Sequence, residues 1–176
     1  MWLREDRGSA SHFIIDLELP AAAAQYGCPQ RAVLQVTVPE HGPAIHLDLQ
    51  WFNKPACRLP EALWFSFTPL NCRPEGWQLD VIDQRVSPLD IVSRGGRSLC
   101  AVQRGVFYHD SLGGLDILTP DAALVAPGSP RLMQFPNTLP DLTEGMHINL
   151  YNNQWGTNHP AWYGEDARFR FTLAIT

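Results

Sequence analysis

Prolines and glycines interrupt this sequence at intervals too short for long helices. The 176 residues include 15 prolines and 13 glycines. Turn-forming clusters occur at residues 94–97 (Arg-Gly-Gly-Arg), 112–114 (Leu-Gly-Gly) and 127–130 (Pro-Gly-Ser-Pro). Short strands joined by tight turns are the structure that such spacing favours.

Apolar and polar residues alternate in most of the segments between these turns, which predicts about ten strands. The expected strands are 12–19, 31–38, 44–52, 63–67, 77–83, 98–108, 115–118, 122–126, a strand within 145–153, and 168–175. The helical candidates are the short segments 21–24 and 59–64. We therefore predict an all-β fold, an antiparallel β-sandwich with little helix, formed by residues 1–176 as a single domain.

Composition excludes several classes of partner. The net charge is −5 and the 13 basic residues are scattered, so neither nucleic acid nor an anionic membrane is expected as a partner. No apolar run approaches the roughly 18 residues of a membrane span, and no leader segment is recognisable. The compartment is undetermined, with a cytoplasmic location as the default.

The four cysteines, Cys28, Cys57, Cys72 and Cys100, are far apart and form no C-x-x-C pair. This spacing argues against a zinc knuckle or a thioredoxin-like pair. Two disulfides are allowed by the count, but we expect free thiols.

Catalytic motifs are absent from the sequence. No G-x-S-x-G, H-E-x-x-H, P-loop or Rossmann pattern occurs. His46 and Asp48 could supply two metal ligands on one strand face, but a solvated strand face has this pattern routinely. Arg58 precedes Glu61 by three residues, a spacing more typical of a structural ion pair than of an acid catalyst. We assign no catalytic residue, no metal and no cofactor.

The segment 145–171 is rich in Asn, Trp, Tyr and His. Met146, Ile148 and Leu150 should share one strand face, and His147, Asn149, Tyr151 and Asn153 the other. Amides and aromatic rings suit a ligand with many hydroxyls and a few C–H patches, so carbohydrate is the natural candidate. In the alternative, the asparagines bond to the backbone and Tyr151 covers the core.

A second polar segment, 51–64, places Lys54 and Arg58 in a proline-bent loop between tryptophans. It could form the rim of a polyol site, or the two cations could simply cover a loop. The candidate substrate-binding residues are Lys54, Arg58, Asn149, Tyr151, Asn153, Trp155, Asn158, Trp162 and Tyr163.

Four blocks carry a resemblance to a known family. They are WFNKPACRLPEALWFSFTP (51–69), SRGGRSLCAVQRGVFYHD (93–110), DAALVAPGSP (121–130) and residues 135–171. From about Ile45 onward the chain resembles the C-terminal β region of family 38-like glycoside hydrolases, the alpha-mannosidase-like proteins. The resemblance implies a galactose-mutarotase-like supersandwich that packs on the catalytic domain of a larger protein through loops 53–61 and 152–163. The family's zinc ligands and nucleophile have no counterpart here, so it also implies a chain that is inactive alone.

Three functions follow as alternatives. The first is an accessory domain that contacts a mannoside-like carbohydrate and packs on the parent catalytic domain. The second is a purely structural domain, with Trp155, Trp162 and Tyr163 as interface anchors that could also support a homodimer. The third is a stand-alone aldose-epimerase-like enzyme using His147 and Glu165.

Overall fold

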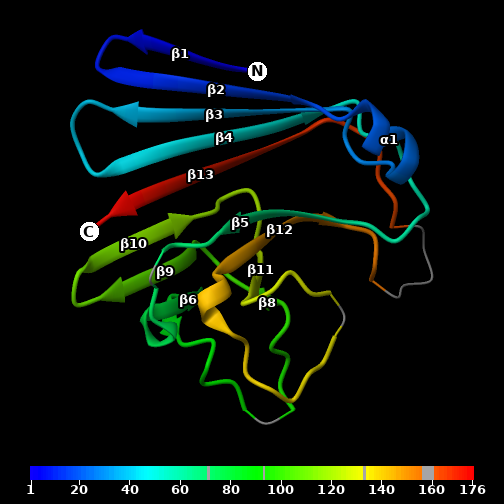
Figure 1. The fold of residues 1–176 in the computed structure, drawn as a ribbon. Coiled ribbons are helices and arrows are strands. Elements are labelled where there is room, and N and C mark those ends of the chain that lie inside the picture. The colour runs from blue at the N-terminus through cyan, green and yellow to red at the C-terminus, as the bar shows by residue number, and fades with distance from the viewer. Residues whose placement is uncertain (71, 93, 133, 156–160) are drawn as a thin grey trace.

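Two antiparallel sheets of unequal size make up this computed structural model (Figure 1). It describes residues 1–70, 72–92, 94–132, 134–155 and 161–176. The large sheet contains, in spatial order, β1 (Trp2–Arg7), β2 (Ala10–Glu18), β3 (Arg31–Pro39), β4 (Ala44–Phe52), β13 (Ala167–Ile175), β10 (Gly113–Leu118), β9 (Gly105–Asp110), β6 (Trp77–Val81) and β7 (Gln84–Val86).

The small sheet contains β5 (Ala62–Phe67), β12 (Met146–Asn152), β11 (Leu124–Pro127) and β8 (Cys100–Ala101), in that order. Among the described residues, α1 (Pro20–Tyr26) is the single α-helix, beside the 3₁₀ turns η1 (Pro74–Gly76) and η2 (Leu142–Glu144). The predicted antiparallel, all-β fold with little helix is confirmed.

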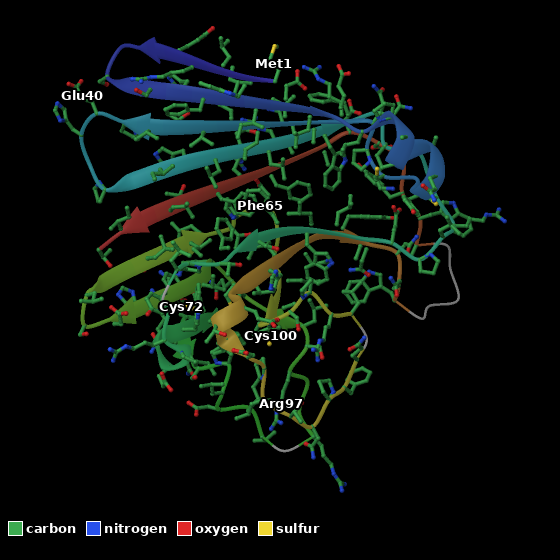
Figure 2. The ribbon with its side chains drawn as sticks, in the orientation of Figure 1. Met1, Glu40, Phe65, Cys72, Arg97 and Cys100 are labelled. Atoms are coloured by element: carbon green, nitrogen blue, oxygen red, sulfur yellow. The ribbon has the colours of Figure 1, made fainter. Side chains whose placement is uncertain are left out.

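The hydrophobic core lies between the two sheets. Phe65 of β5, labelled in Figure 2, lies between the sheets. It stacks on Phe171 of β13 with ring centroids 4.8 Å apart, which joins the sheets directly. The alternation predicted in β4 is correct, because Leu47 and Trp51 are buried in this core while His46 is exposed on the other face. Other core residues include Trp77, Val106, Ile117, Val125, Leu142, Met146, Ile148 and Phe169.

Local differences from the predicted elements have physical reasons. The helical candidate 59–64 is wrong, because residues 62–67 form β5 and pair with β12, and Leu63 and Phe65 of this strand pack against the core. The predicted strand 98–108 is divided into β8 and β9. Gly105 opens β9 where a Cβ would lie 1.9 Å from the carbonyl oxygen of Ile117, so this close approach of two strands requires glycine.

Candidate functional site

Lys54 is the one lysine of the sequence, and its side chain is completely buried. It follows β4 at the end of the sandwich where α1 and the β4–β5 and β12–β13 connections come together (Figure 1). Its ammonium donates to Glu61 Oε1 at 2.7 Å, to the carbonyls of Pro55 and Tyr163 at 3.1 Å, and to that of Gly27 at 3.4 Å. An ammonium has three hydrogens, so these protein acceptors leave none for a ligand.

Tyr151 covers the Lys54 ammonium. The Nζ atom lies 4.7 Å from the centre of the Tyr151 ring, a cation–π distance. The phenol donates to the carbonyl of Ala161 at 3.1 Å and accepts from the N–H of Tyr163 at 3.0 Å. Burial raises the pKa of Tyr151, and the negative charge of Glu61 adds to that rise. The residue is therefore a structural part of this end of the molecule.

Asn153 binds the loop that carries Glu61. Its Nδ2 donates to the carbonyls of Leu59 at 2.7 Å and Cys57 at 3.2 Å, and its Oδ1 accepts from the N–H of Glu61 at 2.9 Å. The side-chain amide of Asn153 thus bonds to the backbone. This is the arrangement predicted as the alternative to a carbohydrate site.

Asn149 and Asn152 are buried within β12. Asn152 Nδ2 donates to Asn149 Oδ1 at 2.6 Å, and Asn149 Nδ2 donates to the carbonyl of Tyr151 at 3.3 Å. The register with β5 shifts between Asn149 and Tyr151, and this irregularity ends the simple alternation predicted for the strand. The hydrogen bonds of Asn149 with Tyr151 and Asn152 stabilise the irregular backbone of β12.

Four further predicted binding residues are described, and we call them the aromatic rim: Arg58, Trp155, Trp162 and Tyr163. The three rings are partly exposed, and the Arg58 guanidinium lies 4.8 Å from the centre of the Trp162 ring. Asn158, also predicted to bind substrate, lies outside the described residues. Whether the rim binds a ligand stays a prediction.

His147 and Glu165, the pair of the epimerase hypothesis, each have other partners. His147 is buried, with Nδ1 2.7 Å from Ser66 Oγ and Nε2 2.8 Å from the carbonyl oxygen of Gly128. Glu165 accepts from the hydroxyl of Tyr163 at 3.4 Å. Both nitrogens of the imidazole are engaged by protein groups, so His147 is poorly placed to act on a substrate.

A different polar surface extends across β2, β3, β4 and β13, on the side of the large sheet that faces away from the core. Strand pairing puts His12, Thr37, His46 and Thr172 in one row directly opposite one another. In the next row Gln35, Asp48 and Arg170 are paired in the same way. Alternation within 44–52 indicated the polar face of β4, but only the pairing with β3 and β13 reveals the other members.

Hydrogen bonds and ion pairs order this surface. His46 Nδ1 lies 3.2 Å from Thr172 Oγ1. Arg168 binds Asp48, with Nε 3.0 Å from each carboxylate oxygen. Arg170 binds Asp121 at 2.8 and 2.9 Å, and this guanidinium lowers the pKa of Asp121.

The surface is hollowed at the centre of these rows. An open hollow of about 290 Å³ is lined by Gln35, Thr37, His46, Leu47, Asp48, Pro120, Arg170, Phe171 and Thr172. We call it the sheet hollow. Its polar lining combines an amide, two hydroxyls, an imidazole, a carboxylate and a guanidinium, which together donate and accept hydrogen bonds in many directions.

In the described part of the chain, His, Cys, Asp and Glu side chains form no group of three or more that could hold a metal ion. The helices there are too short or too polar to span a lipid bilayer. The four cysteines are unbridged.

Comparisons with known proteins add one structural neighbour. No family model matches the sequence, and no curated protein matches it. Among solved structures, the chain is similar to a candidate aldose 1-epimerase from Escherichia coli K12, with 9% identity and a TM-score of 0.45 over 99% of this chain and 68% of that one. The comparisons give no support to a relation with alpha-mannosidase-like hydrolases, and a likeness this distant does not extend to what the chain binds.

Proposed function

We propose that this protein binds a monosaccharide in the sheet hollow. The observation that carries the proposal is the convergence of six polar side chains from three paired strands on one open hollow. They are Gln35, Thr37, His46, Asp48, Arg170 and Thr172. Their positions rest on the register of a regular sheet, so the ligand would meet a rigid surface.

A sugar suits this lining because each of its hydroxyls both donates and accepts. Thr37, Thr172 and Gln35 can do either, Asp48 accepts, and Arg170 donates. The volume of about 290 Å³ lies just below the usual range for ligand pockets, about 300–1,000 Å³. A single ring is therefore the expected ligand, in preference to an oligosaccharide.

The same residues favour an aldose-epimerase-like activity as a second candidate function. His46 and Asp48 are two residues apart on one face of β4, which separates their Cβ atoms by about 7 Å. Interconversion of anomers requires a base at the C1 hydroxyl and an acid at the ring oxygen, and both oxygens are bonded to C1. Asp48 would exchange its ion pair with Arg168 for the C1 hydroxyl and accept its proton. His46 would protonate the ring oxygen, so that the bond from C1 to the ring oxygen breaks and the aldehyde can reclose on its other face.

Binding and activity can be tested with three aldoses: glucose, galactose and mannose. Isothermal titration measures binding, and polarimetry measures the interconversion of freshly dissolved α-anomers. His46→Ala should weaken binding by about tenfold or more and abolish any rate enhancement. The matched control is His109→Ala, which removes an exposed imidazole from β9, where it pairs with Asp116 outside the hollow.

The outcomes separate the candidates. Saturable binding that is lost in His46→Ala and kept in His109→Ala supports a sugar site in the sheet hollow. Accelerated interconversion of anomers that is also lost in His46→Ala and kept in His109→Ala supports the enzymatic function. If the wild-type protein binds none of the three aldoses, the proposal is wrong.

An accessory domain that packs on a hydrolase, as the resemblance implies, is the alternative proposal. It is favoured by the partly exposed aromatic rim, because Trp, Tyr and Arg dominate protein interfaces. If this alternative holds, Trp162→Ala should abolish a response of tryptophan fluorescence to a mannoside, or dissociate a homodimer formed through the rim. His46→Ala should change neither property.

A further inference from the structure

A second hollow lies among the loops beside the small sheet. It has a volume of about 180 Å³ and is bounded by the segment before β8 and by the connection from β11 to β12. Figure 2 shows Arg97 among these loops. The side chains that could bind a ligand there include Arg97, Ser129, Arg131 and Thr138, whereas the Ser98 hydroxyl donates to the carbonyl of Gln134. We call this the loop hollow.

Arg97 is a buried cation, with 8% of its surface exposed. Its Nη1 donates to the carbonyl of Asn137 at 2.8 Å and its Nη2 to that of Ile91 at 2.9 Å, whereas its buried Nε has no hydrogen-bond partner. No carboxylate of a described residue lies within ion-pair distance of it. A buried charge without a counter-ion is costly, and an anion in the loop hollow would supply one.

Arg131 brings a second positive charge from the other wall. It is exposed and forms no hydrogen bond or ion pair with any residue that the structure describes. Ser129 and Thr138 add hydroxyls from the same connection. Guanidinium groups bind carboxylates and phosphates through paired N–H donors, so the two arginines favour an oxyanion.

Two acidic residues, Asp141 and Glu144, also line the loop hollow. Asp141 accepts from the N–H of Thr143 at 3.0 Å and from its hydroxyl at 2.6 Å, so it caps η2 and does not neutralise an arginine. Because carboxylates that are not neutralised accept hydrogen bonds, they favour a ligand that carries donors such as hydroxyls in addition to its anionic group.

We propose that the loop hollow binds a small polyhydroxylated anion through its carboxylate or phosphate group, held between Arg97 and Arg131. This site is separate from the sheet hollow, and its ligand does not depend on the function proposed there.

The test uses the full chain with two probes, inorganic phosphate and D-gluconate. Binding is followed through the backbone amide resonances of Ser98, Ser129 and Arg131. Arg131→Gln is the decisive variant, because Arg131 is exposed and unbonded, so its replacement should not disturb folding. Arg94→Gln is the matched control, since it removes the same charge from an exposed residue outside the hollow.

Saturable shifts with at least one probe are expected, with affinity reduced about tenfold in Arg131→Gln and unchanged in Arg94→Gln. Tighter binding of gluconate would identify a carboxylate as the preferred group, and tighter binding of phosphate would identify a phosphate. The proposal is overturned if neither probe saturates, or if Arg94→Gln weakens binding as much as Arg131→Gln.

Discussion

The ammonium of Lys54 lies 2.7 Å from the carboxylate of Glu61, with both side chains enclosed at one end of the sandwich. The same ammonium is bonded to the carbonyls of Gly27 and Tyr163. Three segments that are distant in sequence therefore meet at one charge: the end of α1, the β4–β5 loop and the β12–β13 connection. The ion pair and the carbonyl bonds of Lys54 therefore hold these three segments together.

Removing one partner of this pair should strongly destabilise the protein. Lys54→Met is expected to lower the free energy of unfolding by about 3–5 kcal/mol, because Glu61 would remain buried without its counter-ion. Urea unfolding measures the change. The double variant Lys54→Met/Glu61→Leu should recover part of the loss, since it leaves no lone charge. If Lys54→Met alone changes the free energy of unfolding by less than about 1 kcal/mol, the ion pair is solvated.

Asn153→Ala tests whether that amide is structural. It should lower the free energy of unfolding by about 2 kcal/mol, because the N–H of Glu61 and the carbonyls of Leu59 and Cys57 would lose their shared partner. Thermal and urea unfolding both report the loss. The control is Gln154→Ala, whose side chain forms no hydrogen bond with a described residue. Unchanged stability in Asn153→Ala would leave the amide available to a ligand, as the sequence predicts.

Alternation at a period of two was sufficient to predict much of the fold. It placed Leu47 and Trp51 in the core and His46 on the polar face, because β4 is covered by the core on one side only. The same reasoning failed at Asn149 and Tyr151, where the register shifts and the period is lost. An irregularity of this kind depends on the partner strand, which local sequence does not show.

The candidate sites depend even more on distant pairing. Arg170 and Thr172 reach the sheet hollow because β13 pairs with β4, more than a hundred residues earlier in the chain. The burial of Lys54 was also missed, although a single lysine among 13 basic residues could have drawn attention to it.

Tyr151 should make stability depend on alkaline pH. Burial first, and then the charge of Glu61, raise the pKa of this phenol above its ordinary value of 10.0. A group whose pKa is raised on folding contributes stability that is fully present below the unfolded pKa and is lost as the pH rises through the folded one. The free energy of unfolding should therefore fall above about pH 10, and urea unfolding between pH 8 and 11 follows the fall. Tyr151→Phe has no phenol to ionise and should show a shallower fall, although Tyr108 and Tyr163, whose pKa values are also raised, keep part of it. If the free energy of unfolding falls equally steeply with pH in the variant and the wild type, Tyr151 ionises without unfolding this end of the sandwich.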